Sequence, residues 1–79
     1  MIKTEIYLRA NISTKDIIAI EDWCSENIGP RARWRDSVND IYNWCNDTMF
    51  GSKTFYFADN DDAVLFRLTY SEFIDYKNA

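Results

Sequence analysis

The sequence contains no histidine and only two cysteines, two glycines and one proline in 79 residues. Without histidine, the chain lacks the commonest general base and the commonest ligand of transition metals. Cys24 and Cys45 are far apart and form no CxxC pair, so they cannot build a zinc site by themselves. The shortage of glycine and proline favours compact, regular elements over linkers.

The motifs of nucleotide-binding and hydrolytic enzymes are also missing. The chain has no GxxxxGK[ST], no GxGxxG and no GxSxG. The run Asp59–Asp62 offers oxygen ligands, but it lacks the central glycine and the bidentate glutamate of an EF-hand, which favours a solvated turn. We therefore expect no enzyme, no catalytic residue, no cofactor and no bound metal.

No apolar run approaches the roughly 20 residues of a membrane-spanning helix. The first ten residues alternate like a strand and do not resemble a secretory signal, which predicts a cytoplasmic protein with reduced cysteines and no membrane partner. Hydrophobic residues make up 47% of the chain, too many for a disordered protein, and the length predicts a single domain over residues 1–79. The net charge of −4 argues against non-specific binding of nucleic acid.

The first third of the chain predicts a strand followed by a helix. Residues 2–10 alternate with period two, which places Ile6 and Leu8 on the inner face of a strand. A helix begins at Ser13 or Thr14 and ends at Gly29-Pro30, because glycine supplies the cap and proline cannot continue the helix. Its buried face carries Ile17, Ile20, Cys24 and Ile28.

The middle of the chain supports more than one interpretation. Residues 31–36 suit either a short strand, with Ala32 and Trp34 on one side, or an extended loop. Residues 37–48 predict a second helix, because the spacing of the first helix recurs there. The recurring positions are Val38, Ile41, Cys45 and Met49. The alternative is a strand over residues 40–45.

Residues 54–70 predict a β-hairpin, around which the rest of the chain is organised. Phe55 and Phe57 form a buried face, the acidic run 59–62 forms the turn, and the alternation then resumes. In the second strand Val64, Phe66, Leu68 and Tyr70 oppose Leu65, Arg67 and Thr69. A short helical end starts at Ser71. The predicted fold class is α+β: a two-layer sandwich whose three- to four-stranded, largely antiparallel sheet carries two helices on one face, loosely ferredoxin-like.

The stretch FYF, an acidic turn and DAVLFRLTY together resemble the C-terminal hairpin of small uncharacterised proteins of marine phages. The matching positions are Phe55, Phe57, Asp62, Ala63, Leu65, Phe66, Leu68 and Tyr70. The resemblance implies a viral protein located in the host cytoplasm. It implies no activity, so no functional residue follows from it.

The second face of the predicted sheet is the candidate interaction surface. Helices on one side leave the other side open, and aromatic and arginine residues gather there. This face carries Tyr7, Arg9, Arg33, Tyr56, Leu65 and Arg67. Such a surface is typical of protein interfaces, which predicts a homodimer or a protein partner. Single-stranded nucleic acid is the alternative partner, through base stacking and phosphate contacts.

Overall fold

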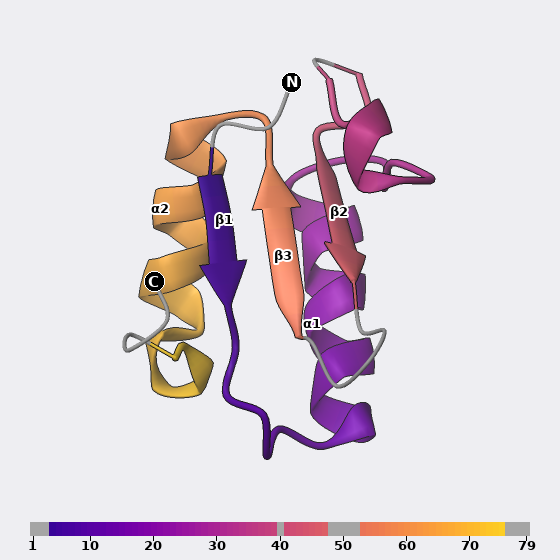
Figure 1. The fold of residues 1–79 in the computed structure, drawn as a ribbon. Coiled ribbons are helices and arrows are strands. Elements are labelled where there is room, and N and C mark those ends of the chain that lie inside the picture. Colours follow the sequence, from indigo (N-terminus) through magenta and orange to yellow (C-terminus); the bar gives the residue numbers. More distant parts are fainter. Residues whose placement is uncertain (1–3, 40, 48–52, 76–79) are drawn as a thin grey trace.

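The computed structural model describes residues 4–39, 41–47 and 53–75, and it shows a three-stranded antiparallel sheet with two α-helices (Figure 1). The predicted α+β class is confirmed. The elements in chain order are β1 (Thr4–Tyr7), α1 (Thr14–Asn27), the 3₁₀ helix η1 (Arg35–Ser37), β2 (Trp44–Asp47), β3 (Thr54–Phe57), α2 (Asn60–Thr69) and the 3₁₀ helix η3 (Ser71–Phe73).

The central strand of the sheet is β3, the last strand in the sequence. The strand order is β1-β3-β2, and β3 runs antiparallel to both neighbours, so β1 and β2 are parallel to each other. Helix α1 is the crossover between those two strands. Beyond β1, Leu8 forms an antiparallel bridge with Ile74, and the Asp75 N–H donates to the Tyr7 carbonyl over 2.8 Å. The segment after η3 therefore adds to the outer edge of β1.

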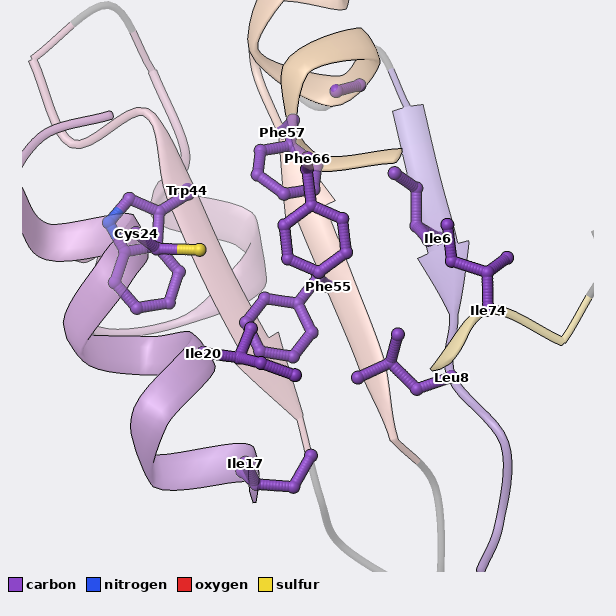
Figure 2. Packing of buried hydrophobic residues seen from close by; sticks show 11 residues of the cluster. Ile6, Leu8, Ile17, Ile20, Cys24, Trp44, Phe55, Phe57, Phe66 and Ile74 are labelled. Carbon is purple, nitrogen blue, oxygen red and sulfur yellow. The ribbon is translucent and has the colours of Figure 1, made fainter. Parts of the chain in front are cut away.

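One side of the sheet faces the main hydrophobic core, which receives residues from both α-helices (Figure 2). Its buried members are Ile6, Leu8, Ile17, Ile20, Cys24, Trp44, Phe55, Phe57, Ala63, Phe66 and Ile74. The Phe66 ring of α2 lies with its centroid 5.1 Å from those of both Phe55 and Phe57. Aromatic side chains of β3 and α2 therefore form the centre of this core.

The structure confirms a first strand, although β1 covers only Thr4–Tyr7 of the predicted residues 2–10. It also confirms the first helix and the inward direction of Ile6 and Leu8. The Ser13 side chain caps α1 by accepting from the Asp16 N–H at 3.1 Å. At the other end Gly29 has φ +143°, a region that other residues rarely adopt, and a Cβ there would lie 2.9 Å from Asn43 Oδ1. Glycine is thus needed at the turn for two separate reasons. The short helical end at Ser71 is confirmed as η3.

The predicted hairpin over residues 54–70 is wrong, because its second half is helix α2. Asp59 caps this helix, its side chain accepting from the Asp61 N–H at 2.8 Å, so the acidic run begins a helix instead of forming a turn. Ala63, Phe66 and Tyr70 recur at helical spacing and pack on the core. The hairpin interpretation also made one side of β3 open, whereas all four of its residues are buried.

The predicted helix over residues 37–48 is also wrong. Trp44 and Cys45 are consecutive and both buried, Trp44 in the main core and Cys45 in a second cluster on the other side of the sheet. Only a strand directs neighbouring side chains to opposite faces in this way. The alternative of a strand is correct in type, although it covers 44–47 instead of 40–45. Met49 lies outside the described residues.

Residues 31–36 do not form a strand. Only Arg31 makes a bridge, to Trp44, and η1 begins at Arg35. Ala32 is buried and Trp34 is 63% exposed, so these two side chains do not share the predicted face.

Candidate interaction surfaces

An arginine-rich segment covers part of the sheet face opposite the main core. We call residues 31–39 the arginine loop. The Ala32 N–H donates to the Trp44 carbonyl over 2.7 Å and fixes the start of the loop beside β2. Ala32 and Val38 then pack with Cys45 and Tyr56 in a second buried cluster. Burying these two small apolar side chains leaves the intervening arginines and Trp34 at the surface.

Two arginine side chains of the loop contact aromatic rings, and the third contacts a backbone carbonyl. The Arg33 guanidinium carbon is 5.6 Å from the centroid of Trp34, and that of Arg35 is 5.9 Å from the centroid of Tyr56. Arg31 Nη2 donates to the Asn46 carbonyl over a long 3.4 Å. These contacts hold the guanidinium groups in place without neutralising them.

Carboxylates contribute little to this arrangement. In the described part of the chain one ion pair is recorded, between Arg35 Nε and Asp36 Oδ1 at 3.8 Å, and both side chains are largely exposed. Exposed pairs of this kind contribute about 0–1 kcal/mol. Arg31 and Arg33 have no ion-pair partner among the described residues. The loop therefore presents positive charge, although the chain as a whole is acidic.

Two hollows lie beside the loop, and Arg31 and Arg33 line both. The larger has a volume of about 580 Å³ and is completed by Ala32, Ser37 and Tyr42. The smaller, of about 290 Å³, extends over β2 and is lined by Arg31, Arg33, Trp34, Arg35, Cys45, Asn46 and Asp47. Tyr42 lines the larger hollow and Trp34 lines the smaller one, and both rings are exposed. The surface thus combines cationic groups, aromatic rings and concave shape.

The predicted interaction face is only partly assembled by the structure. Tyr7 and Tyr56 point to the same side of the sheet, and Arg33 belongs to the loop that covers this side. Tyr56 is only 5% exposed because the loop lies over it. Leu65 and Arg67 are on α2, which packs on the other side, so their assignment to the sheet is wrong.

The remaining predicted members contribute less to this surface. Arg9 follows β1 and is exposed, and its N–H donates to the Phe73 carbonyl over 2.8 Å. The Tyr7 hydroxyl donates to Glu5 Oε2 at 2.9 Å, and this hydrogen bond raises the pKa of Tyr7 above its ordinary value. The prediction omitted Arg31, Trp34 and Tyr42. The alternation of arginine with Ala32 and Trp34 in the run RARWR could have indicated that Arg31 and Trp34 belong to this surface.

A second surface is the outer side of α2. Val64, Leu65 and Leu68 are exposed there, and Leu68, at 76%, is the most exposed of the large apolar side chains described. The opposite side of the same helix is packed into the main core through Ala63 and Phe66. Helix α2 is therefore apolar on both sides.

No protein-family model, curated protein or solved structure matches this chain. Within the described residues no helix has the length and apolar character needed to cross a membrane. The same residues contain no group of three or more histidine, cysteine, aspartate or glutamate side chains that could hold a metal ion.

The two cysteines are free and buried. Burial, with a smaller effect of Glu21 and Asp62, raises the pKa of Cys24 far above the ordinary value of 9.0. Burial also raises the pKa of Cys45, although nearby Arg31 partly opposes the shift. Since the thiolate is the reactive form, both cysteines have the properties of packing residues.

We expect neither thiol to react with Ellman's reagent in the folded protein at neutral or mildly alkaline pH, because both side chains are buried and burial raises the pKa of each. Both should react fully once guanidinium unfolds the chain. The single variants Cys24→Ala and Cys45→Ala assign any signal to one residue. Rapid labelling of either thiol in the folded state would contradict the burial described here.

Proposed function

We propose that the protein is a small non-enzymatic binding or adaptor protein whose arginine loop binds an acidic segment of a protein partner. One observation carries this proposal: Arg31 and Arg33 line two hollows without an ion-pair partner among the described residues, next to exposed Trp34 and Tyr42. Arginine, tryptophan and tyrosine are the residue types that contribute most to protein interfaces. This surface replaces the open sheet face expected from the sequence.

The charge distribution supports an acidic partner. Apart from the arginines at 31, 33 and 35, the chain carries six basic and thirteen acidic side chains, a formal charge of −7. The loop is therefore a positive patch on a negative protein, which repels acidic molecules from most of the surface and attracts them to one place. The planar guanidinium group also suits carboxylates, because it donates two parallel hydrogen bonds to them.

The test is a comparison of two double variants with equal charge changes. Arg31→Gln with Arg33→Gln should weaken binding of a fluorescein-labelled peptide of alternating Glu and Tyr by about 100-fold, since charge-assisted hydrogen bonds are lost. Arg9→Gln with Lys15→Gln removes the same charge outside the loop and should leave affinity within about threefold. Fluorescence anisotropy measures both.

Equal losses in the two double variants would contradict a site at the loop, because net charge alone would then explain them. Failure of the wild type to bind the peptide at low salt would overturn the proposal that the loop takes acidic protein segments. A Lys-Tyr peptide of the same length is the control for aromatic contacts alone and should not bind.

Single-stranded nucleic acid is the second candidate partner. The observation that favours it is the contact of Arg33 with the exposed Trp34, which places a cation beside a ring on which a base can stack. Labelled oligothymidylate tests this possibility. Tighter binding than the acidic peptide, with an affinity that falls steeply with salt, would favour nucleic acid.

We also infer that the fold is a two-layer, ferredoxin-like arrangement with a reduced fourth strand. Two parallel strands, β1 and β2, flank an antiparallel third, which is the split βαβ pattern. The Leu8–Ile74 bridge lies where a fourth strand would pair with β1.

We further propose that the protein is of viral origin and is located in the host cytoplasm. The support for this proposal is the resemblance of the FYF and DAVLFRLTY stretches to small proteins of marine phages.

A further inference from the structure

We propose that α2 is also a self-association surface, through which two copies of the protein pair as antiparallel helices centred on Val64. This surface is separate from the arginine loop, because α2 packs on the side of the sheet opposite the loop. A dimer formed in this way leaves both loops accessible. The pairing does not depend on what the loops bind.

The first support is the distribution of apolar residues around the helix. Ala63, Phe66 and Tyr70 contact the main core, while Val64, Leu65 and Leu68 are exposed on the outer side. A helix that is apolar on both sides is ordinarily covered on both. The outer residues continue the series begun by Asp61, at positions i, i+3, i+4 and i+7, which is the spacing of a helix that packs against another helix.

The second support is a pair of charges that are complementary between two copies. Asp61 and Arg67 each lie three residues from Val64, on opposite sides of it. Neither has an ion-pair partner among the described residues. Six residues apart on one helix, they cannot contact each other. Antiparallel pairing about Val64 places Asp61 of each copy level with Arg67 of the other.

A two-fold dimer requires a surface that is complementary to itself, and α2 meets that requirement. Its first turn carries Asp61 and Asp62, and its last turn carries Arg67. Antiparallel packing brings the acidic end of each helix to the basic end of the other, which also aligns the helix dipoles favourably. A helix of ten residues is about 15 Å long, so the interface is small and the dimer should form in the micromolar range.

Sedimentation equilibrium over a range of concentrations tests the pairing. The wild type should show a reversible monomer–dimer equilibrium, and Leu68→Asp should make the protein monomeric without changing its circular dichroism spectrum. Ile41→Asp is the matched control, because Ile41 is another exposed aliphatic side chain but lies next to the arginine loop. It should leave the dimer intact. A wild type that stays monomeric up to submillimolar concentration would overturn the proposal, as would a dimer that survives Leu68→Asp.

Charge exchange tests the register of the two helices. Asp61→Arg alone and Arg67→Asp alone each place like charges opposite each other and should weaken the dimer about tenfold. The double variant Asp61→Arg with Arg67→Asp restores opposite charges between the copies and should recover most of the affinity. A double variant as weak as the two single ones combined would overturn antiparallel pairing about Val64. Thermal melts of the monomeric forms separate these effects from a loss of helix stability.

Discussion

Replacing Phe66 with alanine should leave the protein largely unfolded. Phe66 has no exposed surface, and its ring lies near the rings of Phe55, Phe57, Trp23 and Tyr70. Removing such a side chain costs about 3–5 kcal/mol through lost burial and the remaining cavity. A domain of this size has a total stability on the order of 5 kcal/mol. Urea unfolding followed by circular dichroism measures the loss.

Leu68→Ala is the control for this prediction, because it distinguishes helix from hairpin. A strand over residues 64–70 would place residues 66 and 68 on the same face and make both substitutions costly. In helix α2 the two side chains diverge, and Leu68 is exposed. Leu68→Ala should therefore cost less than about 1 kcal/mol when measured on dilute, monomeric protein. Similar large losses for Phe66→Ala and Leu68→Ala would contradict the helix.

Trp44→Ala should have an effect of similar size, because Trp44 joins β2 to the turn after α1. The side chain is fully buried, stacks on Phe55 with 6.0 Å between ring centroids, and donates from Nε1 to the Gly29 carbonyl over 2.6 Å. We expect a loss of about 3–5 kcal/mol from truncation of the ring and the unpaired carbonyl. Chemical denaturation at several temperatures measures it.

Trp34→Ala is the matched control for Trp44→Ala. Trp34 has the same side chain but is 63% exposed, so its truncation should change stability by less than about 1 kcal/mol. Intrinsic fluorescence adds a second readout, since Trp34 is open to quenching by iodide and Trp44 is not. An unfolded Trp34→Ala protein together with a stable Trp44→Ala protein would show that the two tryptophans have been assigned to the wrong environments.

The parts of the fold predicted correctly are those in which local signals agree. In α1 the Ser13 cap, the helical spacing of Ile17, Ile20 and Cys24, and the Gly29-Pro30 stop all indicate one helix. In β1 the alternation around Ile6 and Leu8 gives a single inner face. Each of these signals acts within a few residues, so the rest of the chain does not alter the outcome.

The secondary structure was predicted wrongly for the elements that are apolar on both sides. The outer residues Val64, Leu65 and Leu68 interrupt the helical pattern of Ala63 and Phe66 and produce an apparent alternation. The acidic run before them suits a turn and a helix cap equally well. In β2 the same effect arises because Cys45 is covered by the arginine loop, a contact with residues about ten positions away that local periodicity does not contain.

The candidate site was predictable in composition but not in location. Arginines and aromatic residues were expected on the sheet face opposite the helices, and Arg33, Tyr7 and Tyr56 are on that side. What the sequence could not indicate is that the loop itself covers Tyr56 and becomes the surface. The direction of that loop depends on how Ala32 and Val38 pack with residues of two strands, which is a tertiary interaction.

The central position of β3 also constrains how the chain folds during synthesis. Among the described residues, β1 and β2 each pair with β3 and with no other strand, so this sheet cannot begin to form before residues 54–57 have left the ribosome. By then roughly fifty residues have been synthesised after β1, and pairing between segments so far apart in the sequence makes folding slow. The residues that start, pattern and end helix α1, in contrast, are all synthesised well before β3. A nascent chain released before β3 should therefore carry at most a helix without a sheet to pack against, and its apolar face would be open to chaperones and to aggregation.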